Sequence, residues 1–558
     1  MPSADYGPIA RIHGFADLRR TNRDVGPAQS RTQPKNAIMK PPCDQAVVES
    51  GRVAVPCAKA AEPWILAVTI LGSSMGFIDS TVVNVALPAI QRDLAGTVID
   101  MQWVVEGYGL LLSSLILTGG AMGDLFGRRR IFLAGITVFA IASAGCSFAA
   151  NIQELVAARA VQGLGAAFLV PGSLSIISAS FNETERGRAI GTWSSFTSIT
   201  AAMGPVLGGW LIEHASWRWA FFINLPVAAA VIVLSLWRVP ESRTATRSGV
   251  DWTGALIVTA GLAGVTYGFI ESANLGWNNP GVWGTLIAGF ACLIAFLYFE
   301  AHARSPMVPL GLFRSSDFTG ANLLTLFLYM ALGIFFFLFP LNLIQVQHYS
   351  ATATGAAALP FILLMFLLSR WSGGLVDRFG AKLPLVVGPL ISALGFLLFM
   401  VPAVGAGYWT TFFPGFAVLG LGMAVSVAPL TTVVMGAVER DRAGTASGIN
   451  NAVARVAGLL AVAILGMVMV SAFSHHMNQR LAQMSLPLDV KSSLQSNEIR
   501  LATIEIPAGI DPNTATQVRI SISRAFVFGF RIVMLICAVL AVASSGFAWR
   551  MISGNDGG

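Results

Sequence analysis

The sequence predicts an all-α membrane protein with fourteen transmembrane helices, arranged as two groups of six with an additional pair between them. Three observations support this: an apolar composition, a series of long apolar runs, and a short polar loop that occurs twice. Hydrophobic residues make up 55% of the chain and charged residues 11%. Ordinary soluble domains carry about 25% charged residues, so this composition indicates a chain that lies largely in a bilayer.

The apolar runs begin at Trp64, and each is about 20 residues long, which is enough for a helix to cross a bilayer. The first six predicted spans are 64–84, 102–122, 131–150, 154–177, 188–212 and 220–238. The pair is 254–271 and 281–299. The last six are 319–342, 357–374, 383–402, 412–435, 444–472 and 525–549.

These spans divide the chain into a six-helix bundle over 63–238, a linker with two helices over 239–318, and a second bundle over 319–550. The second bundle contains a long polar outer loop at 473–524. Residues 1–62 are mixed in charge and show no sustained periodicity, so we expect a disordered cytoplasmic tail. Residues 551–558 form a short cytoplasmic tail at the other end.

The repeated loop spans 120–130 and returns at 373–382. In each copy an aspartate follows a glycine by four positions, a second glycine follows the aspartate by three, and basic residues come next. Eight predicted helices separate the copies, so both lie on one membrane face, where most connector arginines also occur. By the positive-inside rule this face is cytoplasmic, as are both termini. The residues we assign to gating loops are Gly120, Asp124, Gly127, Arg128, Asp377, Arg378 and Gly380. The same charges also orient the chain, and that role does not exclude gating.

The formal net charge of +7 lies in short connectors and forms no basic face interleaved with aromatics, so we expect no nucleic-acid partner. The five cysteines are scattered, and three lie inside apolar runs, which argues against a disulfide framework or a zinc site. We expect no bound metal.

Asp79 lies deep in the first predicted helix. A charge at mid-bilayer costs about 2.5–3.5 kcal/mol on insertion scales, so the side chain must face protein or water. Because desolvation disfavours the anion, we expect this carboxyl to take up and release a proton near neutral pH. The alternative is a fixed hydrogen bond to Thr81 or to a neighbouring helix.

Glu106 lies in the second predicted helix, nearer to its outer end. If it is buried, it binds a cationic substrate or adds a second titratable site to proton coupling. If it is near water, it is only interfacial.

Arg159 and Gln162 lie three residues apart in the fourth predicted helix and therefore share one face. An arginine at this depth needs a carboxylate or backbone carbonyls as partners. A permanent positive charge near a titrating carboxylate lets proton binding at the carboxylate change the pairing of the arginine. The alternative is a static link between helices.

The fifth predicted helix carries small residues at positions 200, 204 and 208, a spacing that forms a smooth ridge for close helix packing. Pro205 removes one helical hydrogen bond and tends to kink the helix. We assign a conformational role to Gly204, Pro205, Gly208 and Gly209. Static packing alone explains the glycines but not the proline.

Together these residues resemble the major facilitator superfamily, and the fourteen-helix layout is similar to its drug–proton antiporter branch of EmrB/QacA type. The likeness lies in Asp79 to Pro88, the loop at 120–130, Arg159 to Gly163, Gly204 to Gly209 and Trp217 to Pro226. It continues at Asp251 to Gly254, Gln345, Pro360 and Asn450 to Gly458. Three positions depart from the pattern: Thr200 stands where glycine is usual, Glu106 where a small polar residue is usual, and Gly458 alone remains of a glycine-rich run.

The resemblance implies two six-helix bundles around a central cavity, with alternating access to a substrate site near the midplane. It implies proton-coupled export of small amphipathic or cationic molecules from a cell inner membrane, without catalysis and with the proton gradient in place of a cofactor. We assign Gln162, Asn84 and Gln345 to the substrate cavity. A periplasmic adaptor and an outer-membrane channel stay open as further partners.

Two other functions stay open. The same fold serves importers and facilitators of metabolites, and the direction of transport does not follow from the physics of the sequence. A membrane enzyme or scaffold is the third reading, but the sequence offers no Ser-His-Asp set, no histidine-rich helix and no phosphate-cradling loop.

Overall fold

The computed structural model describes residues 61–181, 183–243, 250–303, 306–438, 443–484, 486–504, 506–507 and 510–553. The predicted tail at 1–62 lies almost wholly outside these residues, as does most of the tail at 551–558. The described chain is all-α, which confirms the predicted fold class. Thirteen of its described helices are long and apolar enough to cross a membrane. A shorter apolar helix, Lys382–Leu398, occupies the place of the eleventh predicted span.

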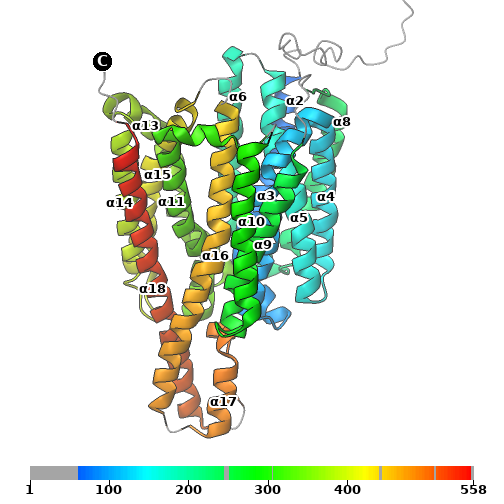
Figure 1. Cartoon of the computed structure of the whole chain (residues 1–558). Helices are drawn as coiled ribbons and strands as arrows, with labels where there is room; N and C mark the ends of the chain where they lie inside the picture. Colours follow the sequence, from blue (N-terminus) through cyan, green and yellow to red (C-terminus); the bar gives the residue numbers. More distant parts are fainter. Residues whose placement is uncertain are drawn as a thin grey trace, which may run out of the picture. The chain divides into compact units, whose positions relative to one another are not determined.

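The first group of helices corresponds to the first six predicted spans (Figure 1). Its members are α2 Glu62–Asp93, α3 Val98–Phe126, α4 Arg128–Phe148, α5 Ile152–Ser180, α6 Glu183–His214, α7 Trp219–Phe222 and α8 Asn224–Arg238. Local sequence explains several starts. Thr97 and Asp100 form a reciprocal capping box on α3, and the Asn151 side chain accepts the backbone N–H of Glu154 at the start of α5.

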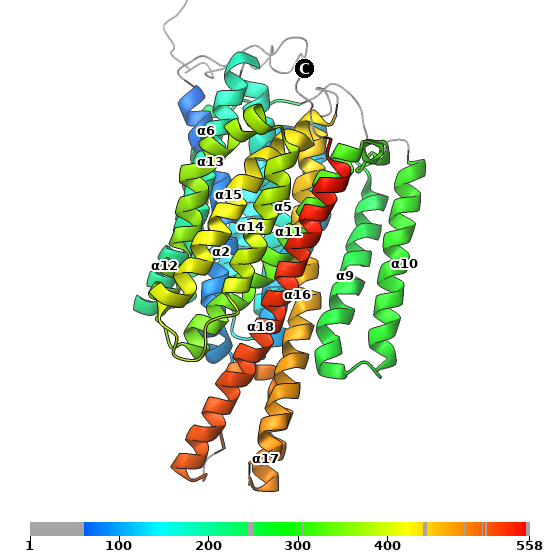
Figure 2. The ribbon, with the colours of Figure 1, turned by 90° about the vertical axis from the view of Figure 1, so that its left-hand side faces the viewer.

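The pair follows as α9 Trp252–Leu275 and α10 Pro280–His302. The remaining elements are η1 Leu310–Arg314, α11 Ser316–Leu341, η2 Asn342–Val346, α12 Ala351–Ala357, α13 Leu359–Phe379, α14 Lys382–Leu398, η3 Tyr408–Phe412, α15 Phe413–Gly436, α16 Ala443–Ala482, α17 Leu488–Ser496, η5 Glu498–Thr503 and α18 Pro512–Met551. Figure 2 shows α9 and α10 side by side, and α9 packs against both α3 of the first group and α16 of the second.

The predicted outer loop at 473–524 is largely helical (Figure 1). Helices α16 and α18 are 40 residues long each and continue well beyond the predicted spans 444–472 and 525–549. The predicted ends of these two spans were wrong, because both helices continue into the polar sequence beyond the apolar runs. Asp511 caps α18 by accepting the N–H groups of Asn513 and Thr514, which fixes its start outside the apolar segment.

The two predicted gating loops are also shorter than expected. Gly120 and Asp124 belong to the last turns of α3, and Arg378 belongs to the last turn of α13. Each helix instead ends at the second glycine of the repeat, because Gly127 has φ +111° and Gly380 has φ +70°, values that favour glycine. The two copies of the repeat therefore share the same helix-ending device.

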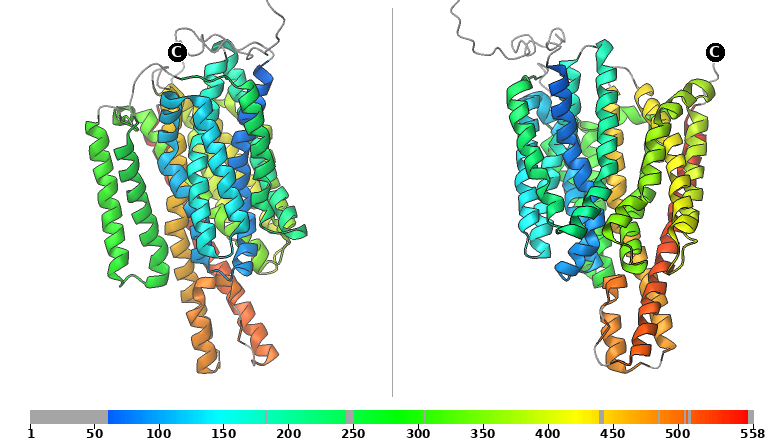
Figure 3. Two further views of the ribbon diagram at one scale, coloured as in Figure 1. Left: turned by 90° about the vertical axis from the view of Figure 1, so that its right-hand side faces the viewer. Right: turned by 180° about the vertical axis from the view of Figure 1, so that it is seen from behind.

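The two groups meet tightly where the C-terminal part of α6 crosses α12 (Figure 3, right). A side chain at Gly209 would overlap the carbonyl of Ala351, and one at Gly355 would overlap the carbonyl of Pro205. The Glu213 carboxylate of α6 also accepts the backbone N–H of Thr352 at 3.2 Å. Glycine is thus required at this crossing for backbone to approach backbone.

Replacing Gly355 by alanine should destabilise this contact by about 1–3 kcal/mol, because the added methyl group overpacks a crossing that has no free space. Thermal unfolding of the purified protein in detergent measures the effect. Gly284→Ala on α10 is the matched control, since a side chain there meets no atom within 4 Å. Equal melting temperatures of the two variants would contradict the assigned crossing.

Candidate proton-coupling site

Asp79 lies in the middle of α2, and its side chain is completely buried. Its carboxylate forms an ion pair with Arg159 of α5, with 2.5 Å between Oδ2 and a terminal guanidinium nitrogen. Arg159 is also buried, with 1% of its surface exposed. The expected need for a charged partner at mid-membrane is therefore met by these two residues together.

Gln162 completes the network from the same face of α5. Its Nε2 donates to Oδ1 of Asp79 at 2.8 Å, and its Oε1 accepts from Arg159 at 2.7 Å. It also donates to the Ser143 hydroxyl of α4 at 3.1 Å. Gln162 is fully buried and bonded on both sides, so in this structure it is a member of the ion-pair network. Its assignment to the substrate cavity stays a prediction.

Two network members were not assigned as site residues from the sequence. Asn224 of α8 donates to Ser143 at 2.9 Å and approaches Oδ1 of Asp79 at 3.4 Å. Ser143 in turn donates to the carbonyl of Phe221 at 3.0 Å. Asn224 is a polar residue inside an apolar run, which was a usable signal, whereas a serine in a helix such as α4 gives almost none.

Arg159 is held by more than its carboxylate partner. Its Nε donates to the backbone carbonyl of Val104 at 3.1 Å, and its guanidinium lies 4.3 Å from the ring centre of Tyr108, both on α3. The arginine thus retains a carbonyl, an amide and an aromatic ring when the Asp79 charge is cancelled. This arrangement would allow the carboxylate to gain or lose a proton without leaving the arginine with no polar partner.

The Thr81 hydroxyl bonds the carbonyls of Phe77 and Ile78 of its own helix, so it is not the partner of Asp79. Thr81 instead meets the small-residue ridge of α6. A side chain at Gly204 would overlap Thr81, and one at Gly208 would overlap Val82. The ridge therefore packs on α2 within one helical turn of Asp79.

Glu106 lies apart from this network. It is 1% exposed, which excludes the interfacial alternative. It stands two residues from Val104 and two from Tyr108, so it points to the other side of α3. No ion pair with Glu106 occurs among the described residues.

The other two predicted cavity residues lie in different places. Asn84 is half-buried and donates to the carbonyl of Ser80 in its own helix at 3.3 Å. Gln345 lies in η2 and donates to Gln91 of α2 at 2.9 Å, while Gln91 donates to Thr503 of η5. Gln345 therefore joins the far ends of the two groups, away from Asp79, and its assignment to the substrate cavity stays a prediction.

The first repeated segment is fastened by a residue that we did not assign. Asp124 pairs with Arg128 at 2.8 Å. Glu241, buried after α8, accepts the backbone N–H groups of Arg129 and Arg130 at the start of α4, at 3.1 and 3.2 Å. This carboxylate caps the positive end of α4. In the second copy Arg378 is exposed, and the side chain of Asp377 lies outside the described part.

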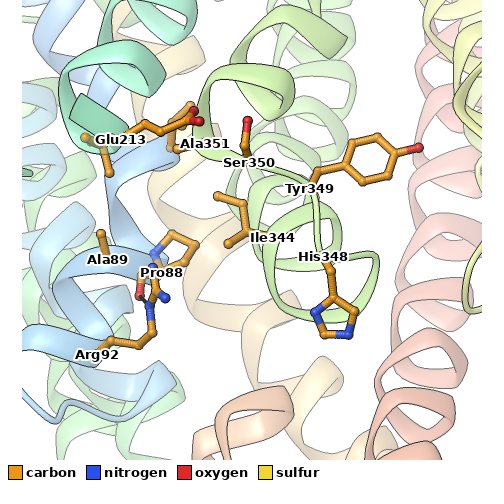
Figure 4. Close-up of a pocket in the computed structure, with 11 residues that line it drawn as sticks. Pro88, Ala89, Arg92, Glu213, Ile344, His348, Tyr349, Ser350 and Ala351 are labelled. Carbon is orange, nitrogen blue, oxygen red and sulfur yellow. Dashed lines mark hydrogen bonds between the residues drawn. The ribbon is translucent and has the colours of Figure 1, made fainter.

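A cavity of about 430 Å³ opens between α2 and α6 on one side and η2 and α12 on the other (Figure 4). Its lining includes the charged or titratable side chains of Arg92, Glu213 and His348. Glu213 and His348 had no predicted role. Neither Asp79 nor Arg159 is part of this lining. Within the described residues no group of three or more potential metal ligands occurs.

The chain matches the family model described as Major Facilitator Superfamily over residues 69–462. It is 33% identical over 493 residues to "Multidrug resistance protein Stp" of Mycobacterium tuberculosis (strain CDC 1551 / Oshkosh), covering 87% of this chain and 91% of that protein. It is 32% identical over 430 residues to "Tetracenomycin C resistance and export protein" of Streptomyces glaucescens, covering 76% and 79%. A bacterial homologue of the human lysosomal transporter Spinster, solved in an inward-facing and unoccupied conformation, has the same fold, with a TM-score of 0.59, 18% identity and coverage of 88% and 98%.

Removing one partner of the buried ion pair should be costly. Arg159→Leu should destabilise the protein by about 3–5 kcal/mol, because it leaves Asp79 buried without its charge partner. Chemical denaturation in detergent measures the loss. Arg218→Ala, which breaks a partly exposed pair with Asp93, should cost no more than about 1 kcal/mol. A loss of stability no larger in Arg159→Leu than in Arg218→Ala would show that the buried pair is not the structural centre.

Proposed function

Because the chain belongs to the Major Facilitator Superfamily, we propose that it is a proton-coupled exporter of small amphipathic or cationic molecules. The observation that supports this most directly is the buried pair of Asp79 and Arg159. It combines a carboxyl group that can bind a proton with a permanent positive charge, whose pairing changes when the carboxyl group is neutralised.

Proton binding to Asp79 removes the negative charge that faces Arg159, so the ion pair loses its Coulomb attraction. The guanidinium then depends on Gln162, the Val104 carbonyl and the Tyr108 ring. A cationic substrate and a proton would both bind to the Asp79 carboxylate, and the carboxylate can bind only one of them at a time. Competition for a single group is sufficient to exchange a proton for a substrate.

The change at Asp79 reaches the bundle interface through α2. Thr81 and Val82 support the glycine ridge of α6, and α6 in turn touches α12 of the second group. A shift of α2 against this ridge alters the α6–α12 crossing, which holds the two groups together at one end. In alternating access such a contact opens while another forms around the fixed site. Pro205 lies inside α6 at this crossing and locally weakens the helix.

The proton gradient supplies the energy. A potential of about 100 mV contributes about 2.3 kcal/mol per charge moved, enough for a roughly fifty-fold gradient of a neutral substrate with one proton. The relatives carry names of resistance and export, and we extend outward transport to this chain on that basis. We place the chain in the fourteen-helix drug–proton antiporter branch, as a transporter without catalytic activity or bound cofactor.

We also propose an orientation in the cell inner membrane. The face that carries Gly127 and Gly380 is cytoplasmic, as are both termini, because arginine is concentrated in its connectors. The α17 end then lies outside, where a periplasmic adaptor and an outer-membrane channel would find it in an organism that has an outer membrane.

Transport into proteoliposomes tests the proposal, with tetracenomycin C and a cationic fluorescent dye as probes. An imposed proton gradient should drive counter-transport of at least one probe by the unmodified chain. Asp79→Asn should abolish the dependence on the gradient, because an amide cannot exchange a proton. Asp93→Asn is the matched control, since Asp93 ends the same helix in a partly exposed pair, and it should transport normally. Unaltered proton dependence in Asp79→Asn would remove that residue from the coupling role.

A further inference from the structure

The side of α3 that faces away from Asp79 carries buried oxygen atoms without hydrogen-bond partners. Oε2 of Glu106 and Oε1 of Gln102 are both in this condition, on residues one helical turn apart. The hydroxyl of Thr266 on α9 is a third such atom, and Thr266 is completely buried. Buried polar atoms normally have partners, so three in one region need an explanation.

Packing places these atoms at the junction of α3, α9 and α16. Gln102 donates its Nε2 to the carbonyl of Val462 on α16 at 2.9 Å. Oε2 of Glu106 lies 3.9 Å from the position that a side chain on Gly109 would take, next to Leu459 of α16. Glu106 therefore lies along the surface of α3 that faces α16.

Thr266 reaches the same junction from α9. It stands one turn before Ile270, which clusters with Ile99 of α3 and Ala463 of α16. Its neighbour Tyr267 has its ring 6.0 Å from that of Trp103 on α3. The chain runs in opposite directions in α3 and α9, so Thr266 lies at the level of Gln102 and Glu106.

The elements packed against this part of α3 carry several charged or titratable groups that could neutralise Glu106. On α5, Arg159 is paired with Asp79 of α2 on the opposite side of α3. On α16, the Arg455 guanidinium lies 5.8 Å from the ring centre of Phe77. On α9, Glu271 accepts from the Trp103 indole. Element η5 brings Glu498, whose pKa is raised by burial, and Arg500, whose carbonyl faces Gln91. None of them pairs with Glu106 among the described residues.

We propose that Gln102, Glu106 and Thr266 form a binding site for one small monovalent cation, either a proton or a sodium ion. A buried carboxylate with no counter-charge is strongly unfavourable, and a bound cation removes that cost. An amide oxygen, a carboxylate and a hydroxyl are all oxygen donors, the kind that hard cations prefer. The site lies where α9 contacts both groups of helices, so the cation would hold the two groups and the linker pair together.

This inference rests on the proposed function, to which it adds a second coupling ion. Glu106 lies on the opposite side of α3 from the Asp79 network, so cation binding there is a separate event. Motion between the two groups would slide α3 along α16 and change the oxygen atoms available to the cation.

Cation binding is measured at equilibrium on the purified full chain, so the result does not depend on transport. For the proton, infrared difference spectra between about pH 9 and about pH 5 should show the carbonyl band of a buried protonated carboxyl. One component of this band should persist in Asp79→Asn and be lost in Glu106→Gln, where only the components of other carboxyl groups such as Asp79 remain. For sodium, exchanging choline chloride for sodium chloride should raise the melting temperature of the unmodified chain and not that of Glu106→Gln.

Thr266→Val serves as a second variant that keeps the carboxyl and removes one oxygen. It should weaken binding of the cation about tenfold, because one buried hydrogen-bonding partner is lost. The proposal is overturned if neither the carbonyl band nor the sodium effect depends on Glu106. If Glu106→Gln does not fold, unchanged cation binding in Thr266→Val overturns it. A defect in transport alone would bear on the proposed function and not on this site.

Discussion

The ion pair between Asp79 and Arg159 is the interaction on which the other features of this chain depend. Two opposite charges on α2 and α5 are buried together, and Gln162, Ser143 and Asn224 connect them to α4 and α8. Breaking such a pair is far more costly than the pair is stabilising, since the remaining charge has no partner. The arrangement is therefore a poor choice for stability alone, and the proton exchange that we propose would give it a use.

The second constraint is the close approach of backbones along α6. Gly204 and Gly208 face α2, whereas Gly209 faces α12 of the other group. One helix thus contacts both the element that carries the titratable carboxyl and the element across the interface. Because packed cores are bistable and not continuously deformable, our proposal has a small shift at α2 change the α6–α12 crossing.

Sequence patterns predicted the all-α class, most of the apolar helices and the central pair of charges, because each follows from strong local rules. The ends of α16 and α18 did not follow, since both helices continue into polar sequence that carries no apolar signal. The hydrogen-bond partners of Gln162 and Gln345 did not follow either, because a resemblance gives the residue but not its partner. Glu241 was missed because its role depends on a contact between segments more than 100 residues apart.

The central claim is that the protonation state of Asp79 sets the position of the two helix groups. Spin labels at Trp210→Cys on α6 and Trp409→Cys on η3, both exposed positions, report the distance between the groups in a background without other cysteines. Pulsed electron paramagnetic resonance should show a distance distribution that shifts with pH when Asp79 is present. The distribution should stay fixed when Asp79 is replaced by asparagine. An identical shift in both proteins would contradict the account.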